Sequence, residues 1–181
     1  MNQKIIMLIL ALICISSAQT YNRSDWGSSW IDVDKDCQNT RQEVLIQESL
    51  IPVTLDSTGC KVVSGLWLCL YTGSIVTDPS KLDIDHLVPL ENANTSGGSE
   101  WPKAIKKEYA NVLIKPFHLV AVLSSTNRSK QSKSPDQWMP SFKPFRCTYL
   151  HEWVNVKERW NLTMTEDEKK AIQTMLSEEC Q

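Results

Sequence analysis

Residues 82–89 read LDIDHLVP, and the pattern of this stretch predicts the central strand of the fold. Apolar and acidic residues alternate along its first half, which is the period of a β-strand with one buried face. The apolar residues would face the core, and Asp83 and Asp85 would share the opposite face. A carboxylate at the end of such a strand can hold a divalent cation, while His86 beside it faces a substrate. Taken alone, an Asp-His pair is equally compatible with a hydrogen bond inside a turn.

A second strand and a helix are predicted further along the chain. Residues 118–123 form a short apolar run typical of a buried strand, and residues 126–130 begin a polar segment that opens a helix. The connection between the two strands contains Ser96-Gly97-Gly98 and then a helix over 100–110, whose start is confined by Pro102. The predicted order is therefore strand, long loop, strand, helix.

Both flanks of this core add further elements. A helix reaching about Ser49 comes first, followed by a strand pair over 60–63 and 66–71 with Ser64-Gly65 as its tight turn. Two helices close the chain, and a capping-box pattern over 165–168 opens the second. The first carries an apolar stripe: Leu150, Trp153, Val154 and Trp160.

The N-terminus has the pattern of a secretory signal peptide. Lys4 supplies a positive charge, residues 5–15 are almost all apolar, and Ser16-Ser17-Ala18 offers small residues for cleavage. The apolar run is too short to cross the ~30 Å hydrocarbon layer as a stable anchor. We therefore predict a signal peptide over 1–18 and a single domain over 19–181, secreted or periplasmic, without a membrane anchor and monomeric.

Cysteine usage agrees with export. Five cysteines follow the predicted signal peptide: Cys37, Cys60, Cys69, Cys147 and Cys180. In an oxidising compartment cysteines usually pair, and an odd count leaves one over. No Cys-x-x-Cys pattern occurs, which favours disulfides over a structural zinc site. Antiparallel packing of the last two helices would bring Cys147 and Cys180 together.

The net charge of −2 excludes a chain that is basic throughout, but it does not exclude a nucleic-acid substrate. Six basic residues form two local groups: Lys103, Lys106 and Lys107, and then Arg128, Lys130 and Lys133. The second group lies beside Asn127. Solvated surface charge is the simpler interpretation of both groups.

Asn127 admits two interpretations that exclude each other. Phosphodiester hydrolysis needs a base, which His86 suits, and a Lewis acid, which an ion on Asp85 would supply. Asn127 follows the second strand, and its amide oxygen could be another ligand of that ion. It also opens a glycosylation sequon, like Asn22, Asn94 and Asn161. A glycan on Asn127 would be incompatible with metal binding.

An ordered series of motifs carries a family resemblance. They are Asp85-His86-Leu87-Val88-Pro89-Leu90, Ser96-Gly97, Trp101, Tyr109-Ala110-Asn111, His118-Leu119-Val120-Ala121-Val122, Asn127-Arg128-Ser129-Lys130, Pro135, Trp138 and Pro140. Matching flanks include Cys37-Gln38-Asn39-Thr40-Arg41, Gly65-Leu66-Trp67 and Cys147-Thr148-Tyr149. Together they resemble the secreted HNH endonuclease family related to the C-terminal nuclease domain of the GmrSD restriction enzymes.

This resemblance implies an α+β fold around a ββα-metal core. The N-terminal helix and hairpin, the two C-terminal helices and the disulfides would be additions to that core. Asp85 and Asn127 would hold one divalent ion, with Mg²⁺ expected before Mn²⁺ or Zn²⁺, and His86 would act as general base. An intervening Asn or His usually orients this base, and Asn111 and His118 both qualify.

Cationic side chains complete the implied site. Lys130 and Arg41 could contact phosphate, although each could equally be a partner in a structural ion pair. Arg128 is a further substrate-binding candidate. The family commonly has an acidic residue where Val112 stands and Gly-Asp where Gln131-Ser132 follow, so loop geometry should differ here.

The cysteines divide into two local closures and one thiol. Cys37 with Cys60 and Cys147 with Cys180 are the expected pairs, which leaves Cys69 free. The expected activity is hydrolysis of DNA, before RNA, with little sequence preference, because no base-reading helix is evident. The alternative is a secreted binding or toxin-like module that keeps the scaffold but has lost turnover.

Overall fold

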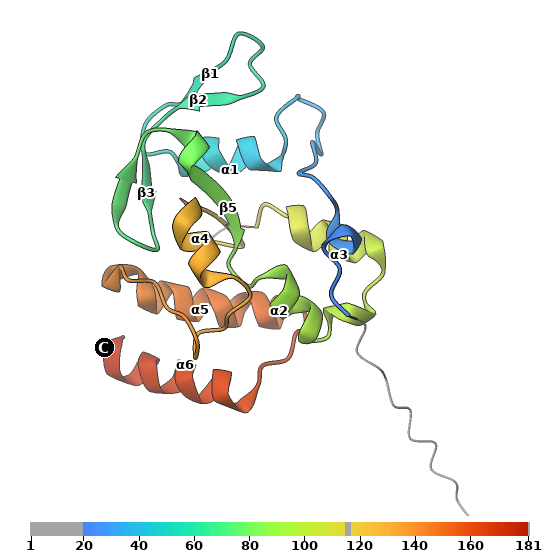
Figure 1. Cartoon of the computed structure of the whole chain (residues 1–181), viewed down its shortest axis with the longest axis vertical. Coiled ribbons are helices and arrows are strands. Elements are labelled where there is room, and N and C mark those ends of the chain that lie inside the picture. The colour runs from blue at the N-terminus through green and yellow to red at the C-terminus, as the bar shows by residue number, and fades with distance from the viewer. Residues whose placement is uncertain (1–19, 115–116, 181) are drawn as a thin grey trace, which may run out of the picture.

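The computed structural model describes residues 20–114 and 117–180, so the predicted signal peptide lies outside the described residues. Within them, six α-helices and three two-stranded antiparallel sheets form a mixed α+β fold, which confirms the predicted class (Figure 1). In chain order the elements are η1 Arg23–Trp26, α1 Thr40–Glu48, β1 Thr54–Leu55, β2 Val62–Ser64, β3 Trp67–Cys69, β4 Ser74–Val76, η2 Pro79–Lys81, β5 Leu82–His86, α2 Leu90–Thr95, η3 Gly98–Glu100, α3 Lys103–Asn111, β6 Leu119–Leu123, α4 Ser124–Lys130, α5 Lys143–Arg159 and α6 Glu166–Glu179. In this part of the chain, no helix has the length and apolar character needed to cross a bilayer.

The β5–β6 ladder lies at the centre of the fold. It is antiparallel, with Asp83 opposite Val122 and Asp85 opposite Val120. Helix α4 follows β6 directly and packs against both strands. The predicted order of strand, connection, strand and helix is confirmed in this segment.

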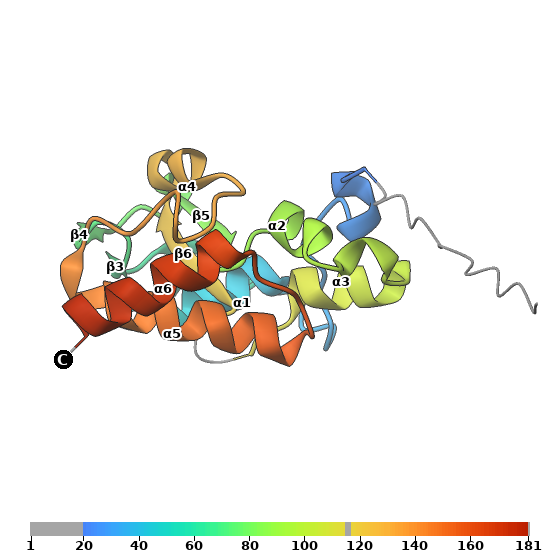
Figure 2. The same cartoon turned by 90° about the horizontal axis from the view of Figure 1, so that it is seen from below.

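Two hydrophobic clusters bury the two faces of this ladder. The cluster on one face contains Leu82, Ile84 and residues of α1, such as Leu45. On the other face, Val120 and Val122 pack in a cluster with the aromatic residues of α5. Because both faces of β6 are buried, its sequence is continuously apolar rather than alternating. Figure 2 shows α1 and α4 on opposite sides of the two strands.

The predicted hairpin across Ser64-Gly65 is wrong. Strand β2 pairs with β1, and β3 pairs with β4 across the turn at Gly73, whose φ is +76°. Gly65 instead allows the ring of Trp67 to pack closely against the backbone, since a Cβ at residue 65 would lie 2.5 Å from that ring. That buried ring also donates its Nε1 hydrogen to the carbonyl of Leu45, at 2.8 Å.

The C-terminal helices and the disulfides follow the prediction. Helices α5 and α6 pack against each other, and Cys147–Cys180 joins their outer ends. Cys37–Cys60 is the second disulfide, and Cys69 is a buried free thiol. One helix was not expected, because α2 forms within the stretch interpreted as a loop.

Candidate active site

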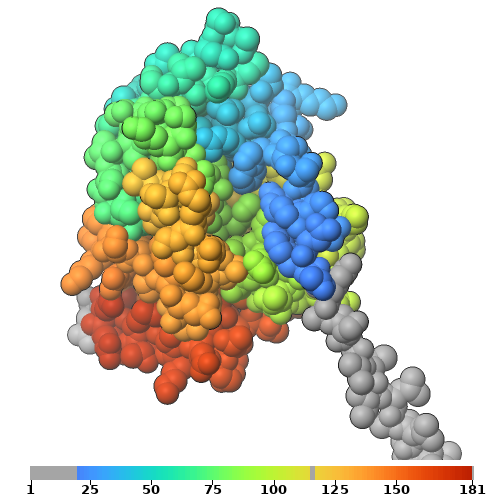
Figure 3. Space-filling model, viewed as in Figure 1, coloured from blue at the N-terminus to red at the C-terminus, as the bar shows by residue number. Residues whose placement is uncertain are grey.

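A pocket of about 210 Å³ opens at the end of β5. Four segments line it: Tyr21 of the N-terminal arm (residues 20–31), Asp85 and His86 of β5, Pro89 to Glu91 at the start of α2, and Gln131 with Ser132 after α4. The N-terminal segment, α2 and the chain after α4 meet on one face of the molecule (Figure 3). The two residues predicted to carry the chemistry therefore lie at one accessible hollow.

His86 is held in a defined orientation. Its Nε2 lies 2.9 Å from the carbonyl oxygen of Ala110, which can only accept, so the proton resides on Nε2 and the lone pair on Nδ1. Two rings lie nearly parallel to the imidazole, Trp30 at 5.6 Å and Tyr109 at 6.3 Å between centroids. Burial, followed by the nearby His118, lowers the pKa of His86 to about 3. The ring is therefore neutral at neutral pH.

Asp85 is a buried carboxylate with two donors on one oxygen. The hydroxyl of Tyr71 and the ammonium of Lys130 each lie 2.7 Å from its Oδ2. Burial raises the pKa of the Asp85 carboxyl, although the Lys130 charge and both hydrogen bonds oppose that shift. Lys130 also donates to the carbonyl oxygen of His86, at 3.0 Å.

The first turns of α4 face the second carboxylate of β5. Asp83 accepts hydrogen bonds from Ser124 Oγ at 2.7 Å and from Asn127 Nδ2 at 3.1 Å. Asn127 and Lys130 are three residues apart and so share a face of the helix. That face thus places Asn127 at Asp83 and Lys130 at Asp85, two residues further along the strand.

Asn111 and His118 have other partners than the one expected. Asn111 Oδ1 accepts from the backbone N–H of Ile31 at 3.1 Å, and its Nδ2 donates to Lys107. His118 Nε2 pairs with the carbonyl of Tyr109 at 2.7 Å. His86 is instead oriented by its hydrogen bond to the main-chain carbonyl of Ala110, in the last turn of α3. The Asn111 side chain bonds the backbone of the N-terminal arm at Ile31.

Two comparisons with known proteins place the chain in a family. The family model described as GmrSD restriction endonucleases, C-terminal domain, matches residues 40–175. The chain belongs to this family. A protein of Arthroderma benhamiae, described as an uncharacterized secreted protein, is 37% identical over 148 residues, which cover 82% of this chain and 71% of that protein. No solved structure matches the chain. The secreted relative and the two disulfides confirm the predicted location outside the cytosol.

Two cations expected at phosphate are used structurally in this GmrSD-family chain. Lys130 is fully buried on Asp85 and cannot reach a substrate. Arg41 donates from Nη2 to the carbonyls of Pro79 and Leu82, both at 2.9 Å, and thereby fixes the start of β5. Arg128 alone of the three is exposed, on α4. Burial explains the correction for Lys130, because an interior cation must bond protein groups. Arg41 is only partly buried, and its two carbonyl partners hold it at the start of β5.

Several residues at the site were not predicted from the sequence. Asp83 had a signal, since it alternates with Asp85 on the same face of β5. Tyr71 belongs to the flanking motif Tyr71-Thr72-Gly73 of the family resemblance, but that motif gave it no role in the site. Trp30 had no signal, because it reaches the site from a distant segment. Trp30 and Tyr21 also precede the residues that the GmrSD family model matches.

Proposed function

We propose that this protein is a metal-dependent endonuclease of the HNH type, with β5, β6 and α4 as a ββα-metal core. Its substrate would be DNA, before RNA, cleaved with little sequence preference. The observation that carries the proposal is the neutral, Nε2-protonated His86 beside Asp85 in the pocket at the end of β5. Membership of the GmrSD C-terminal domain family supports it.

Asp85 at the pocket and Asn127 on the adjacent helix α4 offer oxygen atoms, which a hard divalent cation such as Mg²⁺ prefers as ligands. Asn127 uses Nδ2 on Asp83, so its amide oxygen is the atom that we assign to the ion. Asp85 uses Oδ2 on Tyr71 and Lys130, and we assign its other oxygen likewise. When bound, the ion would supply Lewis-acid stabilisation of the charge that develops on the phosphate.

His86 would take the proton from the attacking water. Its Nδ1 carries the lone pair because Nε2 is bonded to Ala110, and that carbonyl stabilises the imidazolium once the proton has moved. The nearly parallel rings of Trp30 and Tyr109 limit rotation of the imidazole. Arg128, exposed one residue after Asn127, is the cation that we propose for a neighbouring phosphate of the substrate.

Cleavage of plasmid DNA with Mg²⁺ tests this function. His86→Ala removes the base and is expected to reduce the rate roughly 10²–10⁴-fold. Asn127→Ala should require more metal for half-maximal rate, and a chelator should abolish cleavage. His151→Ala is the matched control, because His151 is exposed on α5. Thermal unfolding of each variant shows whether the fold is retained.

The opposite results would favour a binding module without turnover. Full activity of a folded His86→Ala variant would contradict the role of His86 as the general base. Absence of cleavage by the wild-type protein with any of Mg²⁺, Mn²⁺ or Zn²⁺ would remove the enzyme assignment. A glycan on Asn127, found by mass spectrometry, would exclude that side chain as a ligand.

A further inference from the structure

Three aspartates converge in the segment that leads into α1, outside the active-site pocket. Asp32, Asp34 and Asp36 are exposed, and each offers a carboxylate oxygen within 4.8 Å of the others. Carboxylates this close repel one another unless a proton or a cation lies between them. Among the residues that the structure describes, no lysine or arginine forms an ion pair with any of the three.

A fourth carboxylate points to a ligand at this place. Glu43 projects from the first turn of α1, and its Oε2 is buried without a hydrogen-bond partner in the described part of the chain. Burial raises the pKa of this carboxyl, and the charges of Asp34, Asp36 and Asp32 raise it further. The Glu43 side chain is only partly buried and lies outside the 4.8 Å group that the three aspartates form, but their charges reach its carboxyl. A cation held by the three aspartates would therefore also stabilise this unpartnered oxygen.

We propose that residues 32–43 bind one Ca²⁺ ion in a loop of the EF-hand kind. In that pattern, ligands stand at positions 1, 3, 5 and 12 of a twelve-residue loop, with a backbone carbonyl at position 7. Counting from Asp32, Asp34 and Asp36 fall at the third and fifth positions and Glu43 at the twelfth. Gln38 supplies the carbonyl at the seventh.

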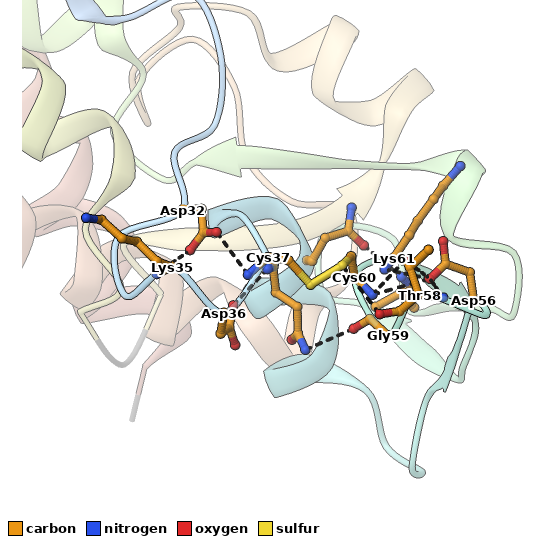
Figure 4. The surroundings of a disulfide bond; sticks show 12 residues. Asp32, Lys35, Asp36, Cys37, Asp56, Thr58, Gly59, Cys60 and Lys61 are labelled. Atoms are coloured by element: carbon orange, nitrogen blue, oxygen red, sulfur yellow. Dashed lines mark hydrogen bonds between the residues drawn. A yellow bond between two sulfur atoms is a disulfide. The ribbon is translucent and has the colours of Figure 1, made fainter.

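The backbone of the loop is already shaped for this register. The sixth position is a glycine in the pattern, where the chain turns sharply. Here it is Cys37, at φ +77°, and Lys35 before it is at φ +64°. The N–H groups of Lys35 and Cys37 donate to the two oxygens of Asp32, at 2.8 and 3.0 Å (Figure 4). The disulfide from Cys37 to Cys60 holds the turn in place.

The donor set favours Ca²⁺ over Mg²⁺. Four carboxylates and a carbonyl from an irregular loop match the flexible coordination of Ca²⁺ by six to eight oxygens, whereas Mg²⁺ demands near-ideal octahedral geometry. A protein outside the cytosol meets Ca²⁺ at high concentration. We expect a Kd of about 10⁻⁴–10⁻³ M, as in extracellular modules.

The loop is connected to the active site through the N-terminal arm. Ile31 directly precedes Asp32, and its N–H donates to Asn111 while its carbonyl accepts from Thr40. Trp30, one residue earlier, lies against His86. An ion in the loop would therefore hold the arm at the pocket. This last consequence rests on the proposed nuclease function, whereas the Ca²⁺ site itself does not.

Titration of the full oxidised protein with CaCl2 after chelator treatment tests the site. Calorimetry should show one Ca²⁺ bound, with a rise in melting temperature that MgCl2 reproduces only weakly. Asp34→Asn and Glu43→Gln should weaken Ca²⁺ binding at least about tenfold, as expected when a charged ligand is lost. Without Ca²⁺, both variants should melt no lower than wild type, because each removes a repelling charge.

Two controls make the result specific. Glu108→Gln removes an exposed carboxylate from the hollow that Asp34 and Glu43 also line, and it should bind Ca²⁺ as wild type does. Asp85→Asn should keep the Ca²⁺ response, which separates this site from the ion proposed at the pocket. No change in melting temperature with Ca²⁺ at about 10 mM, well above the expected Kd, would overturn the proposal. So would an unchanged response in Asp34→Asn and Glu43→Gln.

Discussion

Lys130 illustrates how burial determines the role of a single side chain. Its position after Asn127 suggested a phosphate contact, but its ammonium group is enclosed between the carboxylate of Asp85 and the carbonyl of His86. Removing one partner of such a buried pair typically costs about 3–5 kcal/mol, because the other charge is left uncompensated. Lys130 therefore has a structural role: it joins the end of β5 to the end of α4 and so holds Asp85 and His86 in place.

Gln131, the next residue, has a backbone conformation that suits glycine. It ends α4 at φ +54° and ψ −133°, where a Cβ is strained and where the family commonly has glycine. We predict that Gln131→Gly raises the free energy of unfolding by about 1 kcal/mol, the relieved strain less the greater flexibility of glycine in the unfolded chain. Thermal unfolding should show a rise of roughly 2–4 °C.

Gln131→Ala is the matched control for that prediction. Alanine removes the same side-chain atoms beyond Cβ but keeps the strained backbone, so its melting temperature should not rise. An equal rise for the alanine and glycine variants would show that the long side chain, and not the backbone conformation of residue 131, is unfavourable.

Among the secondary-structure elements, those with a clear period were predictable. The alternation of apolar and acidic residues predicted β5, an apolar run predicted β6, and a capping box predicted α6. Strands β1 to β4 have only two or three residues each, too few to show a period. Helix α2 has six residues with three of low helix propensity, Asn92, Asn94 and Thr95, and forms through tertiary packing.

The candidate site was predictable only in the part that is local in sequence. Asp85 and His86 are neighbours, and Asn127 lies one helical turn before Lys130, so short motifs reveal them. The carbonyl of Ala110 has no signature in the sequence, because every residue has a carbonyl. Tyr71 and Trp30 reach the site through the packing of segments far apart in the chain.

The N-terminal arm is the element whose contribution to the site is easiest to separate from folding. Trp30 is half-buried and stacks on His86 at an interplanar angle of 17°. We predict that Trp30→Leu lowers kcat about tenfold with little change in KM, because a small misplacement of a base is costly. Trp30→Phe should recover most of the activity, since it keeps an aromatic ring beside the imidazole.

Plasmid cleavage kinetics with Mg²⁺ check this prediction. Ser29→Ala, an exposed change in the same arm, should have wild-type kinetics. Equal losses in Trp30→Leu and Trp30→Phe would contradict a stacking role. A loss of activity that merely follows a lower melting temperature would indicate that Trp30 stabilises the fold without positioning His86.

Across the molecule, several polar and charged side chains are buried together with the two hydrophobic clusters. Buried lysines pair with Asp85 and with Glu168, and two imidazoles lie within or beside the core. His118 is only 1% exposed, and its Nδ1 has no hydrogen-bond partner among the described residues. A proton added there would place an unpaired donor in the core. Stability should therefore depend on pH.

The direction of this dependence follows from the pKa of His118, which burial lowers from 6.5 to about 4. Below pH 6.5 the unfolded chain binds the proton first, so the free energy of unfolding falls as the pH drops from 6.5 towards 4. Between pH 7 and pH 5 we predict a loss of about 2 kcal/mol from this residue. His118→Gln, which can still donate to the Tyr109 carbonyl, should show a smaller loss in urea unfolding, whereas His151→Gln on the surface of α5 should match wild type. Equal pH dependence in both variants would mean that His118 is not neutral in the folded protein, and that its burial is compensated by a partner that binds the imidazolium.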